Sequence, residues 1–167
     1  FISYIYTSSL ENNEKQYLDL VKDVLENGEK RQTRNSTTLS MFGKHLKFDL
    51  RNGYPLLTTK KMFLRGIIEE LLFFIRGDTN SKLLEDKNVN IWKGNTSREF
   101  LDSLGMCDRP EGIMGPMYFY QIRNFNSEYD ELTGKPKNKS DCDQLQYVID
   151  TIKSDPTSRR IMMTVYN

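Results

Sequence analysis

The sequence has few of the residues that metal centres and disulfide-stabilised folds require. It contains 2 cysteines, Cys107 and Cys142, and 1 histidine, His45. Two cysteines that lie far apart, without a second histidine, match neither a disulfide framework nor a zinc site. Neither cysteine has a histidine nearby, so we interpret both as reduced thiols rather than nucleophiles. We therefore expect no bound metal.

The chain also lacks an excess of charge and a long apolar run. Lysine and arginine total 24 against 23 acidic residues, which gives a formal net charge of +1, whereas a nucleic-acid surface is usually basic. No segment is long enough to cross a membrane, and residues 1–6 lack the basic flank of a signal peptide. We expect no membrane partner, no specific nucleic-acid partner and a cytoplasmic location, with a mitochondrial or nuclear pool as alternatives.

In the first half of the chain, apolar spacing predicts both helices and strands. Residues 14–27 carry apolar side chains at helical spacing, and Gly28 supplies a stop. Residues 39–50 alternate apolar and polar side chains around Gly43, which predicts a hairpin of two half-buried strands. Residues 63–76 are apolar almost all round, which is typical of a helix buried in a core. The fold class predicted from these patterns is mixed α+β.

The second half alternates loops with amphipathic segments. Residues 96–99 (TSRE) have the form of a capping box that opens a short helix. Residues 107–116 resemble a loop, and the polar residues 126–142 predict a long exposed connection. Residues 143–154 predict an amphipathic helix, and residues 161–166 form an apolar run of β type.

Two adjacent carboxylates lie in the apolar helix predicted over residues 63–76. Burial disfavours the ionised form of a carboxyl, so an inward-facing Glu69 or Glu70 would be suited to donate or relay protons. The alternative is that both lie on an exposed stripe or pair with Arg65. Spacing alone favours this alternative, because ionised carboxylates are rarely buried without a partner.

Three arginines are candidates for binding a small anion. Arg159 and Arg160 lie between a turn and an apolar segment, where they could bind a phosphate or form a solvated pair at a strand start. Arg34 lies among small hydroxyl and amide residues at positions 33–38 (TRNSTT), a loop of the kind that can offer donors to an anion. No Gly-x-x-x-x-Gly-Lys is present, so nucleoside triphosphate binding has no support.

Trp92 is the only tryptophan and precedes a glycine. It could form a wall on which a flat heterocycle stacks, or it could be a half-buried core residue. General statistics for tryptophan favour the core position.

The linear order of several motifs closely resembles the thymidylate synthase family. The resemblance runs from about Leu18 to Asn167. The segments that carry it are residues 53–61 (GYPLLTTKK), 64–72 (LRGIIEELL), 75–80 (IRGDTN), 90–92 (NIW), 97–101 (SREFL), 115–118 (GPMY) and 155–161 (DPTSRRI). The family's fold implies a mixed sheet with a long buried helix, incomplete here at the C-terminus. By this resemblance residues 1–13 are a linker or N-terminal extension, and 14–167 are the N-terminal part of the domain.

The resemblance implies reductive methylation of dUMP to dTMP, with methylenetetrahydrofolate as the co-substrate. It also implies a homodimer with shared active sites. It assigns Glu70, rather than Glu69, and Tyr118 to proton transfer. The remaining assignments are Arg34 to the nucleotide phosphate, Arg159 and Arg160 to the phosphate bound by the partner subunit, Ile91, Trp92 and Asn95 to the folate, and Lys60 to a position near its glutamate tail.

Several positions depart from the family's pattern. The phosphate loop usually reads Asp-Arg-Thr-Gly-x-Gly-Thr, whereas residues 33–38 are one residue shorter and lack glycine. Because glycine allows backbone angles that serine and threonine resist, we expect this loop not to wrap a phosphate in the family's manner. Phe119 stands where the family has glycine, and Ile122 where it has tryptophan. The family's Pro-Cys-His nucleophile would lie beyond Asn167.

Three interpretations follow from the resemblance. The first is a thymidylate synthase, represented here by a fragment and joined upstream to dihydrofolate reductase in some forms. The second is a degenerate, non-catalytic relative that belongs to a larger assembly. The third is a pyrimidine deoxynucleotide hydroxymethylase. Without its nucleophile, a covalent mechanism loses nearly all of its rate, so we expect these 167 residues alone to be inactive.

Overall fold

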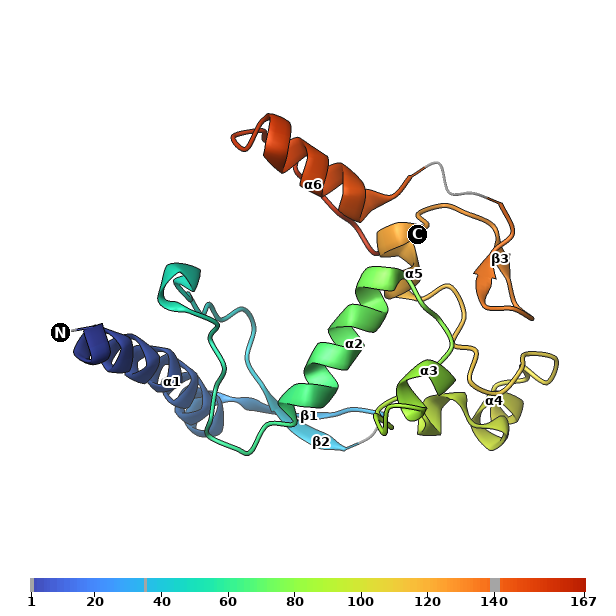
Figure 1. The fold of residues 1–167 in the computed structure, drawn as a ribbon. Coiled ribbons are helices and arrows are strands. Elements are labelled where there is room, and N and C mark those ends of the chain that lie inside the picture. The colour runs from blue at the N-terminus through green and yellow to red at the C-terminus, as the bar shows by residue number, and fades with distance from the viewer. Residues whose placement is uncertain (1, 35, 139–141) are drawn as a thin grey trace. The chain divides into compact units, whose positions relative to one another are not determined.

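A computed structural model describes residues 2–34, 36–138 and 142–167; the side chains of residues 2–12 and 52 are not described. The chain divides into two compact units, Phe1–Met62 and Phe63–Asn167, and each is considered by itself (Figure 1). Position 35 of the predicted anion loop lies outside the described residues, as do positions 139–141 of the predicted connection.

The first unit begins with helix α1, Ile2–Asn27. Its end at Asn27 was predicted, and the N–H of Gly28 donates to the carbonyl of Val24 at 2.9 Å. Its start differs from the prediction, because residues 2–13 continue the helix. Their assignment as a linker or extension stays a prediction.

A hairpin follows α1, but it is not the predicted one. Strand β1, Glu29–Gln32, pairs antiparallel with β2, Thr37–Ser40, so that Glu29 faces Ser40 and Gln32 faces Thr37. The prediction of a hairpin around Gly43 is wrong. It relied on apolar alternation, whereas the four side chains of β1 are polar and exposed, and backbone pairing joins the two strands.

The rest of the first unit is mostly irregular and is tied to α1 by side chains. The short 3-10 helix η1, Leu50–Asn52, is capped by Asp49, whose carboxylate accepts from the N–H of Arg51 at 3.1 Å. The carboxylate of Glu14 accepts hydrogen bonds from the N–H of Thr58 and the hydroxyl of Thr59. These bonds hold the segment before residue 62 against the helix.

The second unit is largely helical. Its elements are α2 Leu64–Arg76, α3 Lys82–Glu85, η2 Gly94–Thr96, α4 Arg98–Ser103, α5 Tyr118–Arg123, β3 Tyr129–Asp130, β4 Lys135–Pro136 and α6 Gln144–Ser154. Helices α2, α4 and α6 match the predicted ones. The N-cap of α4 is Ser97, not Thr96, because the Ser97 hydroxyl accepts from the N–H of Phe100. Helices α3 and α5 were not predicted, since such short helices show no periodicity.

Helix α2 supplies much of the core of the second unit. It ends at Arg76 and is capped by Gly77, whose φ of 70° is left-handed and therefore suits glycine. Phe73 is buried together with Leu84, Val89, Met114 and Phe119. The expectation that the whole helix is buried does not hold for the described chain. Five of its apolar side chains are exposed, because packing partners lie on one side only: Leu64, Ile68, Leu71, Leu72 and Ile75.

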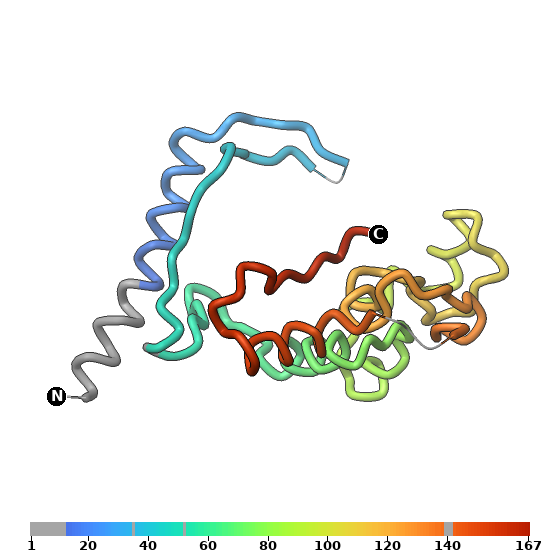
Figure 2. The backbone as a smooth tube through the Cα atoms, turned by 90° about the horizontal axis from the view of Figure 1, so that it is seen from above, coloured from blue at the N-terminus to red at the C-terminus, as the bar shows by residue number. Residues whose placement is uncertain are grey.

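After α6 the chain turns back and runs extended toward the start of that helix (Figure 2). The prediction of a strand over residues 161–166 is wrong, since a side chain holds this segment rather than a neighbouring strand. The amide of Gln144 donates to the carbonyl of Thr164 at 2.7 Å and accepts from its N–H at 2.9 Å. The same amide donates to the carbonyl of Gln121 at 2.8 Å, which ties the segment to α5.

The α+β prediction is confirmed. The described residues hold two separate antiparallel strand pairs, β1 with β2 and β3 with β4. The second pair lies inside residues 126–142, which were predicted to be a long exposed connection. Its register places Tyr129 opposite Pro136 and Asp130 opposite Lys135.

Candidate functional site

The structure separates the two adjacent carboxylates of α2. Glu69 forms an ion pair with Lys87, with 2.6 Å between Oε2 and Nζ. Glu70 turns instead toward the indole of Trp92, whose Nε1 donates to Oε1 at 2.8 Å. Spacing left open whether these carboxylates face inward or form an ion pair with Arg65. Glu69 forms an ion pair, but its partner is Lys87 rather than Arg65.

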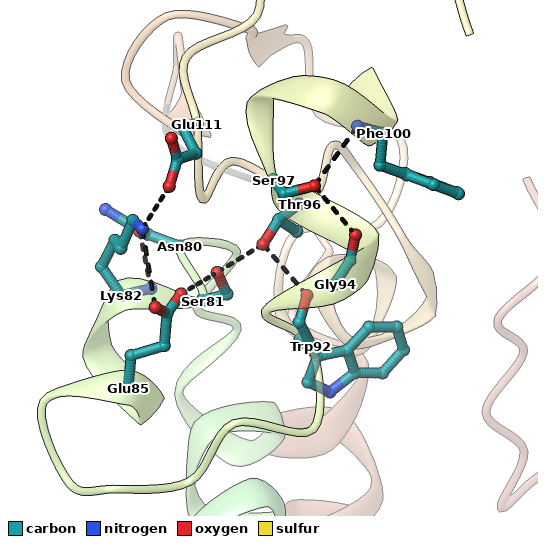
Figure 3. Close-up of polar contacts among 10 residues, drawn as sticks. All are labelled: Asn80, Ser81, Lys82, Glu85, Trp92, Gly94, Thr96, Ser97, Phe100 and Glu111. Carbon is teal, nitrogen blue, oxygen red and sulfur yellow. Dashed lines mark hydrogen bonds and ion pairs between the residues drawn. The ribbon is translucent and has the colours of Figure 1, made fainter. Parts of the chain in front are cut away.

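The loop that carries Trp92 is fixed by a buried polar network (Figure 3). The hydroxyl of Thr96 donates to the carbonyl of Trp92 at 3.0 Å and lies 2.8 Å from the hydroxyl of Ser81. Ser81 is fully buried and Thr96 nearly so. Buried polar groups that satisfy one another hold a unique arrangement, so this network sets the backbone position of Trp92.

Ion pairs of Lys82 lie beside this network. Lys82 reaches Glu111 at 2.6 Å and Glu85 at 3.5 Å, and the hydroxyl of Ser81 donates to Glu85 at 3.2 Å (Figure 3). Its neighbour Glu111 holds the ammonium of Lys82 charged, which raises the pKa of Lys82. The pair of Lys82 with Glu111 thus ties α3 to the segment around residue 111, while the bond between Ser81 and Thr96 joins the start of α3 to the loop on which Trp92 lies.

Tyr118 is the first residue of α5 and lies beside Trp92, the indole of which binds Glu70. Its ring meets Phe74 edge to face at 5.6 Å and lies 6.5 Å from the ring of Trp92. Burial and, to a smaller extent, the negative charge of Glu70 raise the pKa of the Tyr118 hydroxyl. The phenol is therefore protonated at neutral pH, and the charge of Glu70 acts on it.

Phe119 completes an aromatic cluster around this site. Its ring stacks on Phe74 with centroids 5.1 Å apart and meets Trp92 at 6.2 Å. Phe74 lies one helical turn after Glu70, and residues at i and i+4 share a helix face. The sequence pattern showed that spacing, but it did not indicate that position 119 would reach the same place.

Trp92 and Asn95 also line a pocket of about 210 Å³. Its wall is mainly apolar and comes from α4 and from the segment before α5, with Phe100, Leu101 and Met114 among its members. Ile91, predicted with them, is 52% exposed.

The same pocket contains a guanidinium that the sequence did not single out. Arg109 pairs with Glu131 at 2.6 Å and donates to the carbonyl of Met114 at 3.4 Å. No local pattern marks this arginine, because its partner lies in a hairpin that follows α5.

The predicted anion-binding residues are exposed. Arg159 and Arg160 lie in the turn after α6, and the hydroxyl of Tyr147 donates to the carbonyl of Arg160 at 3.0 Å. Arg34 belongs to the first unit, in the connection between β1 and β2. There the N–H and hydroxyl of Thr33 both donate to the carbonyl of Ser36, at 2.9 and 2.6 Å. These two donors of the predicted anion loop are already engaged.

Lys60 also belongs to the first unit. It is exposed and lines a pocket of about 180 Å³ with Tyr17, Leu57, Thr59 and Met62. Within the second unit the structure thus brings together Glu70, Trp92 and Tyr118. Their assigned roles, and those of the other predicted site residues, stay predictions.

The described residues contain neither a candidate metal site nor a candidate membrane span. No group of three or more histidine, cysteine or acidic residues in the described part of the chain is placed to hold a metal ion. No helix in the described part is long and apolar enough to cross a membrane.

Comparison with known proteins identifies a single family. A family model described as thymidylate synthase matches residues 15–167. The thymidylate synthases of Bos taurus and Homo sapiens are both 47% identical over 157 residues, which is 93% of this chain. A putative bifunctional dihydrofolate reductase-thymidylate synthase of Oryza sativa subsp. japonica is 48% identical over 157 residues, also 93% of this chain.

This chain spans only part of each relative. The matched region is 50% of the human protein, 44% of the bovine protein and 32% of the rice protein. The similarity therefore concerns one part of a longer polypeptide in all three relatives.

Proposed function

The chain belongs to the thymidylate synthase family, and from this premise we propose that the protein carrying it converts dUMP to dTMP with methylenetetrahydrofolate. The observation that supports the proposal most directly is the cluster of Glu70, Trp92 and Tyr118. It combines a half-buried carboxylate, an indole donor and a protonated phenol. This combination is suited to moving protons around a bound pyrimidine.

Glu70 is the group that would give and take protons. The indole N–H of Trp92 donates to Oε1 of Glu70, and this hydrogen bond fixes the orientation of the carboxylate. The other oxygen, Oε2, does not take part in that bond. The phenol of Tyr118 is a second group that can hold a proton beside it. A positioned acid–base group of this kind typically contributes about 10²–10⁴-fold to a rate.

The residues beside the pocket fit the flat part of a folate. Trp92 offers an aromatic surface, the amide of Asn95 can orient a polar edge, and the rest of the wall is largely apolar. When bound, the folate supplies the one-carbon unit and the hydride. Ile91 would contact it as well, and Lys60 would lie near its glutamate tail.

The phosphate of the nucleotide would be bound by guanidiniums. Arg159 and Arg160 are exposed and could act across a homodimer, while Arg34 would act within its own subunit. Arginine forks bind a dianion with two parallel hydrogen bonds and so orient the attached ring.

The proposed reaction needs a nucleophilic cysteine that these 167 residues do not supply. Cys107 and Cys142 are both exposed thiols. We propose that the nucleophile comes from the rest of the polypeptide. We also propose that the complete protein includes a fused dihydrofolate reductase, as the name of the rice relative indicates for that protein.

One observation favours a second candidate, a non-catalytic subunit of a larger assembly. The donors of Thr33 are satisfied inside the β1–β2 connection, so they are not available to a phosphate in the present arrangement. A relative that has lost nucleotide binding would need no such donors.

The test uses the complete protein and two neighbouring carboxylates. Glu70→Gln should lower turnover of dUMP to dTMP about 10²-fold or more, because the acid–base group is lost. Glu69→Gln is the matched control, since it removes only an ion pair with Lys87 and should leave turnover within about threefold. Equal turnover in Glu70→Gln and the unaltered protein would remove Glu70 from the mechanism.

Equilibrium binding of dUMP to the same proteins separates the two candidates. Saturable binding, unchanged in Glu70→Gln, is expected of the enzyme. A complete protein that forms no dTMP, does not bind dUMP and purifies with a larger complex would overturn the proposal in favour of the non-catalytic subunit.

A further inference from the structure

Phe119 is fully buried and contacts two other segments of the second unit, helix α2 and the loop that carries Trp92. From α5 its ring meets Phe73 and Phe74 of α2, at 5.5 and 5.1 Å, and Trp92 of the connecting loop at 6.2 Å. It also meets Tyr118 at 5.1 Å. Phe119 is therefore in ring contact with both aromatic residues that surround Glu70.

The contacts of Phe119 differ in geometry. The ring is nearly parallel to that of Phe74, with an interplanar angle of 5°, whereas it meets Trp92 at 71°. Stacked and edge-to-face pairs are both favourable arrangements, so one ring can satisfy both neighbours. Phe74 belongs to the same face of α2 as Glu70, so the stack also ties the indole to the helix that carries the carboxylate.

We propose that Phe119 is a positioning residue that fixes the indole of Trp92 so that its N–H stays bonded to Glu70. The orientation of the Glu70 carboxylate depends on this bond, so the catalytic consequence of the proposal rests on the proposed function. The bond itself does not require that function to be correct.

Backbone contacts do not hold the indole in this orientation. Thr96 fixes the carbonyl of Trp92, but the side chain can still rotate about its own bonds. The contacts that restrain the ring include the hydrogen bond to Glu70 and its packing against Phe119 and Tyr118, beside the rest of the core cluster. Tyr118 is 39% exposed and Phe119 is fully buried, so Phe119 is the more rigid of the two supports.

The exchange rate of the Trp92 indole N–H tests this inference. In the complete protein labelled with ¹⁵N-indole tryptophan, the signal is assigned by its loss in Trp92→Phe. Phe119→Leu removes the aromatic ring but keeps an apolar side chain. Because the indole loses this support, its N–H exchange rate should rise about two- to tenfold. Because no substrate is present, this result stands whether or not the protein forms dTMP.

Tyr120→Leu is the matched control. Tyr120 is the next residue of α5 and is also fully buried, but its ring packs on Tyr129 rather than on Trp92. It should leave the indole exchange rate within about twofold, because no contact of Trp92 is lost. A loss of packing that merely loosened the unit would raise the rate in both variants and would overturn the proposal.

A second variant at the same position is available in case Phe119→Leu does not fold. Phe119→Met fills irregular space with a flexible side chain, and it replaces Phe119→Leu if that protein does not fold. In either variant, an indole exchange rate equal to that of the unaltered protein would mean that Phe119 does not position Trp92. Phe119→Gly, the residue expected from the family, should give a rate at least as high as Phe119→Leu.

Discussion

The β1–β2 hairpin of the first unit and the aromatic cluster of the second unit carry two different kinds of predicted site. In the hairpin, all four side chains of β1 are exposed, and Arg34 lies in the exposed connection. In the cluster, the ring of Phe119 is fully buried and the bond between Glu70 and Trp92 is half-buried. The predicted site in the hairpin therefore consists of exposed charged side chains, whereas the site in the cluster consists of packed aromatic rings around a carboxylate.

This difference decides whether each region can hold the geometry of its site without a ligand. Packed rings and satisfied buried bonds hold one geometry without a ligand, because any other arrangement leaves voids or unpaired groups. Exposed guanidiniums gain little from their own surroundings and are ordered chiefly by the anion that they bind. We infer that the proton-transfer part of the proposed site is preorganised and that the phosphate-binding part depends on ligand and partner.

The largest difference between the regions should be in stability. Phe73→Ala should lower the free energy of unfolding by about 3–5 kcal/mol, because it opens a cavity under a side chain with no exposed surface. Phe42→Ala, at a fully exposed ring of the first unit, should change it by less than about 0.5 kcal/mol. Urea unfolding of both variants measures these values, and similar losses would contradict the assignment of the core.

The next largest effect should be on nucleotide binding. Arg34→Ala should weaken dUMP about tenfold or more, with little change for deoxyuridine, because only the nucleotide carries the anion. Arg31→Ala, in the same hairpin, removes a guanidinium that pairs with Glu29 and should leave both affinities nearly unchanged. Calorimetric titration measures the four affinities. Equal losses for dUMP and deoxyuridine would mean that Arg34 does not reach the phosphate.

A third comparison uses two threonines. Thr96→Val should destabilise the protein by about 1–3 kcal/mol, because it leaves the buried Ser81 hydroxyl and the Trp92 carbonyl with one partner fewer. Thr37→Val removes an exposed bond to Gln32 and should cost less than about 0.5 kcal/mol. Denaturant unfolding measures both, and an unaffected Thr96→Val would mean that the network does not hold the Trp92 loop.

The sequence predicted the elements whose signals are local. The helix over residues 143–154 was recognisable from its apolar face, and Asp143 caps it by accepting from the N–H of Gln146. The order of motifs identified the family, although spacing alone could not choose between Glu69 and Glu70. That choice depends on Trp92 and Lys87, which lie about twenty residues away in the chain.

The failed predictions were those that depend on a neighbour elsewhere in the chain. Residues 161–166 have strand composition but are held by the side chain of Gln144. The first hairpin strand contains no apolar residue, so the alternation rule could not detect it. Phe119 was visible only as a departure from the family's glycine, and its role became apparent from its contacts with α2 and with Trp92.

The smallest expected effect is on the ionisation of Tyr118. Burial is the larger and the charge of Glu70 the smaller cause that raises the pKa of its hydroxyl above the ordinary value of 10.0. The neutral phenol is therefore favoured by folding, and its ionisation should lower stability only as the pH rises past that value. Phenolate absorbance of the protein minus that of Tyr118→Phe measures the midpoint. Glu70→Gln should lower this midpoint only part of the way, because burial remains; a complete return would make the carboxylate the main cause.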